Sequence, residues 1–294
     1  MATLRELKGR IGSVASSEKI TGAMKMISSA KMHKAEQELK QLLPYRNQVQ
    51  TIIASLLSAD TPMTSPLITP REVKNITLVA WGSDDGLCGA FNVNLFKILI
   101  ARLDYYTQTY GNDVNIRIIP VGSKMLKAAS KLNRNGVTVS ALPGVDSKAN
   151  ADTVRAMLDT LRSSFLAGDT DLVDLQYMHF QSISRQRPVT EQLLPIVQEN
   201  LLGEGEAAKN SRPYIFEPSA EAIFSAILPL FLLSTLQEVF VENRAAEQAA
   251  RVMAMQSAND NAKKLRDQLQ LEYNKLRQQG ITTELLDILG GQIR

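Results

Sequence analysis

The sequence predicts an α/β protein whose chain begins and ends in long helices that pack together as an antiparallel coiled coil. Three observations predict this arrangement. No proline precedes Pro44 and none follows Pro229, residues 219–279 contain no glycine, and the residues between the two ends alternate short apolar runs with helical patterns. Since an average globular helix has about 11 to 12 residues, both terminal segments are unusually long.

In the N-terminal segment, 1–58, apolar residues recur every three or four positions, as on one face of a helix. The stripe is formed by Leu4, Leu7, Ile11, Val14, Ile20, Met24, Ile27, Leu39, Leu42, Val49, Ile52 and Leu56. Its changes of phase are typical of a coiled-coil seam with stutters. The C-terminal segment, 219–294, has a similar stripe of Ile223, Ile227, Leu230, Leu236, Phe240, Val252, Met255, Ala262, Leu265, Leu269, Leu276, Leu285 and Ile288. The two helices would form a shaft.

The middle of the chain, residues 73–200, predicts a Rossmann-like domain with a parallel sheet and right-handed crossovers, because strands and helices alternate there. We expect strands at Val73–Trp81, Val114–Val121 and Leu172–Phe180, and helices at Asn94–Tyr110, Lys124–Asn133 and Ala151–Phe165. The segments 59–72 and 201–218, which are rich in proline or glycine, are expected to be linkers.

A simple geometric argument predicts how the terminal helices pair. If the middle domain returns the chain to the place where it left, the helices run antiparallel, and residue i lies opposite roughly residue 277 minus i. Met24 then lies near Met253, and Leu4 near Tyr273. About 18 residues at the end of the C-terminal helix, some 27 Å, remain without a partner. Their apolar side chains, Ile281, Leu285, Leu286, Ile288 and Leu289, require a surrounding socket to bury them.

The charge of the chain is mildly basic, with a formal net charge of +3 and 5% aromatic residues, which does not favour nucleic-acid binding. Residues 1–58 hold nine Lys or Arg against four Asp or Glu. Lys25, Lys31, Lys34 and Lys40 could face acidic surfaces of a partner, although by themselves they favour the simpler interpretation as a solvated helix face.

Cysteine content and apolar patterning exclude several other classes. The single cysteine, Cys88, excludes an internal disulfide and predicts a small buried apolar side chain. The charged first ten residues predict no secretory signal peptide. The longest apolar run, 222–236, is shorter than the roughly 20 residues of a membrane-spanning helix, so we expect only peripheral membrane association.

Two glycine-containing turns follow predicted strands, where phosphate-binding loops occur. The first, 82–92, has glycines spaced by four and three residues and two aspartates that would repel phosphate. The second, Gly122-Ser-Lys124, lacks the upstream glycine of a P-loop. We interpret both as strand-to-helix turns. His33 and His179 suggest no metal site, and no nucleophile with an adjacent base is apparent, so neither catalysis nor a cofactor is expected.

Three stretches together resemble the gamma subunit of F-type ATP synthases. Residues 20–35, ITGAMKMISSAKMHKA, are similar to the family pattern K-I-T-x-A-M-x-M-V-A-x-x-K, and Ser83 to Asn92 is similar to S-D-R-G-L-C-G-G-F-N. The most specific stretch is EQAARVMAMQSANDNA at 247–262, followed by LEYNKLRQQGITTELLDI at 271–288. Asp85 replaces the usual arginine of the second pattern, which puts in doubt any salt bridge of that loop with neighbouring subunits.

The resemblance implies a central rotor stalk, a non-catalytic subunit that turns inside a hexamer of three alpha and three beta subunits. It would couple proton flow through Fo and the c-ring to ATP synthesis or hydrolysis on the beta subunits. The α/β domain would lie beside the epsilon subunit and the c-ring, on the cytoplasmic side of the bacterial plasma membrane, with no direct membrane insertion and no cofactor.

The resemblance also implies roles for individual residues. Met24, Arg251, Arg277 and Gln278 match positions that contact a beta subunit, and Ile281, Leu285 and Ile288 belong to a tip in an apolar bearing that extends to Ile293. Ser83, Asp84, Asp85 and Gly86 are possible contacts of the foot domain.

Two rival hypotheses come from other classes of protein. A soluble α/β enzyme with dimerising helices would show turnover as an isolated chain. A coiled-coil module for acidic partners, including nucleic acid, would bind DNA in a salt-sensitive way.

Overall fold

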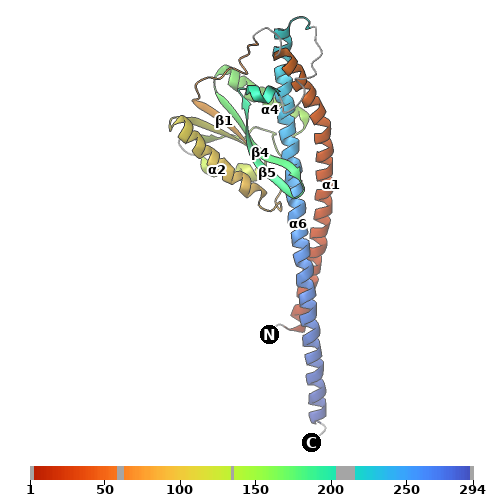
Figure 1. The fold of residues 1–294 in the computed structure, drawn as a ribbon. Helices are drawn as coiled ribbons and strands as arrows, with labels where there is room; N and C mark the ends of the chain where they lie inside the picture. Colours follow the sequence, from red (N-terminus) through yellow and green to blue (C-terminus); the bar gives the residue numbers. More distant parts are fainter. Residues whose placement is uncertain (1–2, 58–62, 134–135, 203–215, 292–294) are drawn as a thin grey trace. The chain divides into compact units, whose positions relative to one another are not determined.

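The computed structural model describes residues 3–57, 63–133, 136–202 and 216–291. The chain divides into two compact units. The helical unit consists of Met1–Ser29 and Arg251–Arg294, and the sheet unit of Ala30–Ala250. Two long helices, α1 (Leu4–Leu57) and α6 (Ala220–Gly291), contribute to both units. Figure 1 draws both units and labels several of their helices and strands.

Within the helical unit, α1 and α6 pack antiparallel through polar contacts. Asn259 donates from Nδ2 to the Glu18 carbonyl at 2.6 Å, and Arg266 pairs with the Glu18 carboxylate at 2.5 Å. The same pairing recurs in the sheet unit, where Glu38 meets Arg244 and Arg46 meets Glu238. In these contacting pairs the two residue numbers add up to between 277 and 284, whereas the sequence predicted a sum of 277. The predicted antiparallel pairing is therefore confirmed, and the observed register differs from the predicted one by at most two helical turns.

The seam between the helices differs from the predicted one in the middle of the N-terminal segment. Ile20 and Ile27 are 60% and 56% exposed, whereas Ser28 is buried and Gly22 faces α6. A Cβ on Gly22 would lie 3.3 Å from Asn259 Nδ2, so the two backbones approach too closely for large side chains. The prediction that Ile20 and Ile27 belong to the seam was therefore wrong, because small residues occupy it there.

The last part of α6 has no partner helix among the described residues. Every side chain from Ile281 to Leu289 is exposed, while Leu269 and Met255, nearer the middle of the helix, are buried. The exposed end predicted from the helix lengths is confirmed. Ile293 and the inner helix end at Ser58 lie outside the described residues.

The sheet unit contains a five-stranded sheet in the order β3-β2-β1-β4-β5. Its strands are β1 (Asn75–Trp81), β2 (Asn115–Val121), β3 (Val137–Val139), β4 (Leu172–Ser182) and β5 (Arg185–Leu194). The first four pair in parallel, with Asn75 opposite Asn115 and Ile76 opposite Leu172. β5 pairs with β4 antiparallel, which corrects the predicted purely parallel sheet to a mixed one.

Helices cover both faces of the sheet, so its central strands are buried on both sides (Figure 1). α2 (Phe91–Tyr110) and α3 (Ser123–Ala129) pack on Ile76, Leu78 and Ala80. α4 (Ala151–Ala167) packs on the opposite face together with the parts of α1 and α6 that belong to this unit. Trp81 is fully buried there, with its ring edge against Phe240 of α6 at a centroid distance of 5.2 Å.

Three elements were not predicted from the sequence, namely β3, β5 and the short helix α5 (Gln198–Leu202). β3 has three residues, too few for a periodic pattern, and β5 contains Pro188, which argues against a central strand but is tolerated on an edge. The predicted helix Lys124–Asn133 is shorter in the structure, because α3 is followed by a 3₁₀ turn at Ser130–Leu132.

One described helix, α6, contains a window long and apolar enough to cross a membrane by these two criteria alone. More than half of that window, 56%, is buried inside the protein, as in the core helix of a soluble protein. Its apolar composition is therefore explained by the sheet and α1, which cover it.

The close approach at Gly22 gives a direct test. Gly22→Leu should destabilise the helical unit by about 1 to 3 kcal/mol, because the added side chain meets Asn259. Gly12→Leu, in the same helix, has open space around its Cβ and should be neutral or stabilising. Hydrogen exchange of residues 251–270 in the full chain measures the difference, and equal exchange in both variants contradicts the proposed packing.

Candidate interaction surfaces

The loop after β1 is organised around the carboxylate of Asp84. This carboxylate accepts hydrogen bonds from the Ser123 amide at 2.8 Å and from the Ser147 amide and hydroxyl at 3.0 and 2.6 Å. The Ser123 hydroxyl donates in turn to the Asp84 carbonyl at 2.9 Å. Asp84 therefore joins the end of β1, the start of α3 and the loop before α4.

This arrangement explains why the loop is not a phosphate site. An Asp84 oxygen accepts the amide of the first residue of α3, which would otherwise be free to bind an anion. The glycines serve close packing instead. A Cβ on Gly82 would lie 2.6 Å from Met125 Cβ, and Gly122, at φ +94°, lies against the backbone of Gly82 and Ser83. The interpretation as strand-to-helix turns agrees with this geometry.

The protonation of Asp84 follows from two opposed effects. Partial burial opposes ionisation, but the hydrogen bonds from Ser147 and the amides of Ser123 and Ser147 outweigh it, so the pKa of Asp84 is lowered below its usual value. A lowered pKa means that the contribution of Asp84 to stability is present at neutral pH and is lost only as pH falls through the folded-state pKa.

The charge of Asp85 is compensated within the chain. Lys148 Nζ lies 3.3 Å from Asp85 Oδ2, and both side chains are more than half exposed. Such an exposed pair contributes little to stability. The replacement of the family's arginine therefore creates an internal ion pair on the surface of the sheet unit.

Only part of the predicted foot contact is accessible. Ser83 is fully buried, where its amide donates to Asn92 Oδ1 and its hydroxyl to the Asp85 carbonyl. Cys88 is also buried, as predicted. Asp85, Gly86 and Leu87 are exposed, as are Gly89 and Ala90 beyond the buried Cys88. Leu87 was missed, although an apolar residue beside Gly86 and Asp85 in a turn is a recognisable sign of a contact surface.

The predicted shaft contacts in the helical unit differ in exposure. Arg277 and Gln278 are exposed, Met24 is half-buried, and Arg251 is only 6% exposed. Sequence reasoning missed the exposed apolar side chains Met26 and Leu271, which are 68% and 71% exposed. Together with Ile20 and Ile27 they give the unit an apolar surface besides its end.

The predicted basic face of α1 is present in the structure. Lys31, Lys34 and Lys40 are exposed, Lys25 is half-buried, and none of the four forms an ion pair with another described residue. In the sheet unit, a hollow of about 180 Å³ is lined by Lys31, Lys34, Ala35, Glu38, Ser147, Lys148, Arg244, Glu247 and Gln248. Its cations outnumber its carboxylates by four to two.

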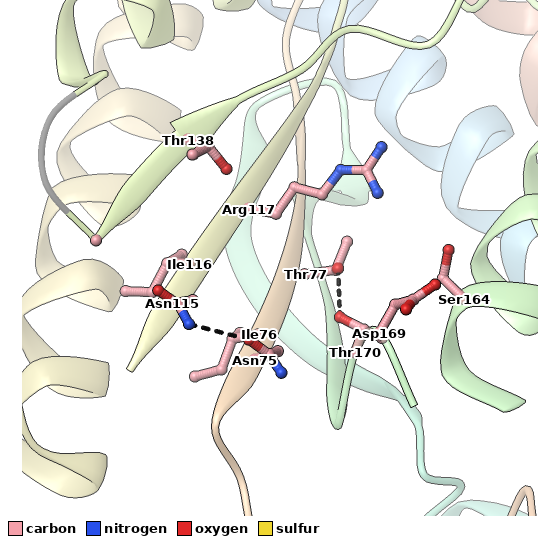
Figure 2. Close-up of a pocket in the computed structure, with 11 residues that line it drawn as sticks. Asn75, Ile76, Thr77, Asn115, Ile116, Arg117, Thr138, Ser164, Asp169 and Thr170 are labelled. Carbon is pink, nitrogen blue, oxygen red and sulfur yellow. Dashed lines mark hydrogen bonds between the residues drawn. The ribbon is translucent and has the colours of Figure 1, made fainter. Parts of the chain in front are cut away.

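A second cavity, of about 140 Å³, lies at the opposite end of the strands and contains none of the predicted contact residues (Figure 2). Thr77 and Thr170 hydrogen-bond to each other beside it at 2.6 Å, and Asn115 donates to Asn75 at 3.1 Å. Figure 2 shows that the side chain of Arg117 extends from β2 over this cavity. Because these four polar side chains bind one another and Arg117 donates to Ser140, the cavity does not suggest a specific ligand.

The described residues contain no group of three or more His, Cys, Asp or Glu placed to hold a metal ion. Each histidine pairs with one glutamate. His33 lies 2.9 Å from Glu36 on the surface of α1, and His179 lies 2.7 Å from Glu242 in the sheet unit.

Comparison with known proteins places this architecture in a family. The family model described as ATP synthase matches residues 3–292. The ATP synthase gamma chain of Bacteroides thetaiotaomicron is 41% identical over 302 residues, covering 100% of both chains. The chain belongs to the ATP synthase gamma chain family. It is thus the non-catalytic central stalk subunit of an F1Fo ATP synthase.

Solved structures share the fold at lower sequence identity. A chain of the Euglena gracilis mitochondrial ATP synthase has a TM-score of 0.63 at 20% identity and covers 98% of this chain and 93% of its own length. A chain from the central stalk and c-ring of the Tetrahymena thermophila mitochondrial ATP synthase has a TM-score of 0.56 at 23% identity, covering 81% and 99%. This architecture of two long helices and a central sheet is therefore shared with chains of these two mitochondrial ATP synthases.

The role of Asp84 can be tested by an isosteric change. Asp84→Asn should destabilise the sheet unit by about 2 to 3 kcal/mol, because its amide nitrogen would face either the Ser123 amide or the two donors of Ser147. Asp85→Asn is the matched control and should cost less than about 1 kcal/mol, since it removes only an exposed ion pair. Denaturant unfolding of the full chain measures both, and an equal loss in the two variants contradicts the structural role of Asp84.

Proposed function

We propose that this chain rotates inside a hexamer of three alpha and three beta subunits and couples proton flow through Fo and the c-ring to ATP synthesis or hydrolysis on the beta subunits. The observation that supports this most is the exposed apolar end of α6. Nine consecutive exposed residues that include two isoleucines and three leucines are unfavourable in water, so a surrounding protein surface is needed to cover them.

The mechanism follows from the asymmetry of the helical unit. The unit consists of two different helices, on which exposed apolar side chains such as Met26 and Leu271 occur among charged ones, so each orientation offers a different contact to each surrounding subunit. A contact energy that differs among three otherwise equivalent subunits shifts their conformational equilibria, and with them their nucleotide affinities. Rotation then makes each subunit pass through the same states in turn.

We infer specific contacts for the named residues. Arg277 and Gln278 would bind a beta subunit, since the planar guanidinium pairs well with carboxylates. Met24, farther along the shaft, would contribute a separate apolar contact, and Arg251, only 6% exposed in this chain, would act mainly by supporting it. Ile281, Leu285 and Ile288 would form the bearing tip.

The sheet unit would provide the contacts at the foot of the rotor. Its exposed loop at Asp85 and Gly86, supported from beneath by Ser83 and Asp84, would meet the epsilon subunit or the c-ring. The complex would lie on the cytoplasmic side of the bacterial plasma membrane, with this subunit bound peripherally. The proposed domain organisation is a shaft of 1–58 and 219–294, linkers at 59–72 and 201–218, and a foot domain of 73–200.

Assembly tests the proposed function directly. Co-expression with the other F1 subunits should give a complex that contains one copy of this chain per hexamer, and quantitative mass spectrometry measures the ratio. A chain that stays outside the hexamer, or enters it in several copies, contradicts the proposal.

The bearing role of the tip is tested by Ile281→Ser, Leu285→Ser and Ile288→Ser in combination. The complex should still assemble through the remaining contacts, but ATP-driven proton pumping should fall about tenfold or more, because polar side chains fit an apolar socket poorly. The matched control changes three exposed polar residues of the same segment, Thr282, Thr283 and Glu284, to alanine. Equal pumping by both variants contradicts the bearing role.

The proposed beta contact is tested by Arg277→Ala. Removing a charged hydrogen-bonding group at an interface should lower the turnover of the assembled complex about tenfold, with subunit composition unchanged. Lys263→Ala, an exposed cation elsewhere on α6, serves as the control for the loss of a positive charge. If both changes have the same effect, Arg277 contributes only general charge.

A further inference from the structure

A cluster of ionisable side chains lies where the β4–β5 hairpin packs against α6 within the sheet unit. Glu238 and Glu242, one helical turn apart on α6, are 8% and 5% exposed. Arg46 of α1 lies 2.6 Å from Glu238, and His179 of β4 lies 2.7 Å from Glu242. Each buried carboxylate therefore has one cationic or potentially cationic partner.

The hairpin adds three further ionisable groups to this cluster. Arg187 of β5 lies directly opposite His179 in the strand register, on the same face of the sheet. Glu191 of β5 hydrogen-bonds to the buried Tyr177 of β4, whose pKa is raised by burial and then by Glu191 and Glu242. When the His179–Glu242 pair holds one proton besides that of the neutral imidazole, on either partner, the cations of the cluster equal its carboxylates. When that proton is lost, one carboxylate has no compensating charge.

We propose that the His179–Glu242 pair is a proton-controlled clasp that holds the β4–β5 hairpin against α6 and loosens as its proton is lost. The neutral imidazole can still donate one hydrogen bond to Glu242. The loosening comes from charge, because Glu242 and Glu238 are then two buried carboxylates, one turn apart, and among the described residues only the half-buried Arg46 gives either of them an ion pair of fixed charge.

The direction of the pH effect agrees with the environment of Glu242. Burial raises the pKa of Glu242 to about 7, His179 lowers it, and Glu238 and Glu191 raise it further. A carboxyl group whose pKa is higher in the folded state than in the unfolded state stabilises the fold fully below its unfolded value, near 4.5. That contribution is lost as pH rises through about 7. The clasp is therefore closed in mild acid and open in mild base.

The pH-dependent loosening should be confined to the hairpin, because a second contact between the sheet and α6 contains no ionisable group. Asn243, next to Glu242 on α6, accepts the Met178 amide at 3.2 Å and donates to the Gly82 carbonyl at 3.2 Å. These bonds keep the centre of the sheet on α6 at every pH. The hairpin beyond Met178 is the part that can move.

The consequence for the complex rests on the proposed function. In a rotor, a looser hairpin would make the connection between the foot domain and the helices less stiff. The clasp would therefore make this stiffness depend on the pH of the compartment that contains the stalk. The physical test needs only the chain itself. Failure of the clasp and failure of the rotor assignment are therefore distinguishable.

The chain offers a sharp experiment because it contains only two histidines, His33 and His179, each paired with a glutamate. Hydrogen exchange of the full chain between pH 6 and 8.5, corrected for the intrinsic rate, should rise about tenfold in residues 176–190, as expected for one linked proton, and much less in the β1 and α2 peptides. His179→Lys, which keeps a cation at every pH, should abolish this rise. His33→Gln, the matched control, should leave it unchanged.

A second variant keeps the test decisive if His179→Lys fails to fold. Glu242→Gln removes the titrating carboxylate while preserving a hydrogen-bonding group, and it should flatten the pH dependence in the same peptides. Imidazole NMR of the full chain, with His179 assigned by comparison with His33→Gln, should show the ring environment of His179 changing over the same pH range as the exchange. An exchange profile that is unchanged in His179→Lys and Glu242→Gln, or that depends on His33, overturns the proposal.

Discussion

The antiparallel packing of α1 against α6 is the contact on which the other features of this protein depend. The two helices have 54 and 72 residues and owe most of their stability to tertiary packing, because intrinsic helix propensity contributes little per residue. In the helical unit, that packing combines buried apolar side chains such as Leu7, Met255 and Leu269 with small residues and a few polar pairs, with Gly22 close to Asn259 and Glu18 bound to Arg266. In the sheet unit, the same two helices supply Ile53, Leu56, Phe224 and Phe240 to the core under the sheet. Helices and sheet thus stabilise one another.

The sheet has the topology of a ligand-binding α/β domain, but its polar groups are used internally. At the ends of β1 and β2, where such domains bind phosphates, Asp84 accepts hydrogen bonds from Ser123 and Ser147, and Gly82 packs against Met125. The crevice is closed by the protein's own side chains. A fold that binds cofactors in other proteins can therefore serve a non-catalytic subunit. Here the Asp84 carboxylate holds three segments of the chain together instead.

The side chains left exposed are as informative as the buried ones. Apolar residues stay in water at the end of α6 and on the outer face of α1, while the buried face of α6 carries Glu238, Glu242 and Asn243. This distribution is the reverse of what a monomer alone would favour. It is consistent with a subunit whose surface is completed by other proteins and whose interior contains charges in pairs. One such pair includes a histidine, which makes the attachment of the hairpin sensitive to protons.

The sequence alone determined the two long helices, the α/β character of the middle and the exposed end of α6, because apolar periodicity and the absence of proline and glycine act locally. It also carried the family motifs. The tertiary structure decided what depends on contacts between distant segments. The seam passes through Gly22 and Ser28 instead of Ile20 and Ile27, since the distance between helix backbones, which no local pattern encodes, selects small residues. β5 pairs antiparallel beside β4 as an edge strand, where Pro188 is tolerated. The partners of Asp84, Asp85 and His179 come from elements far along the chain, and only folding brings them within hydrogen-bonding distance.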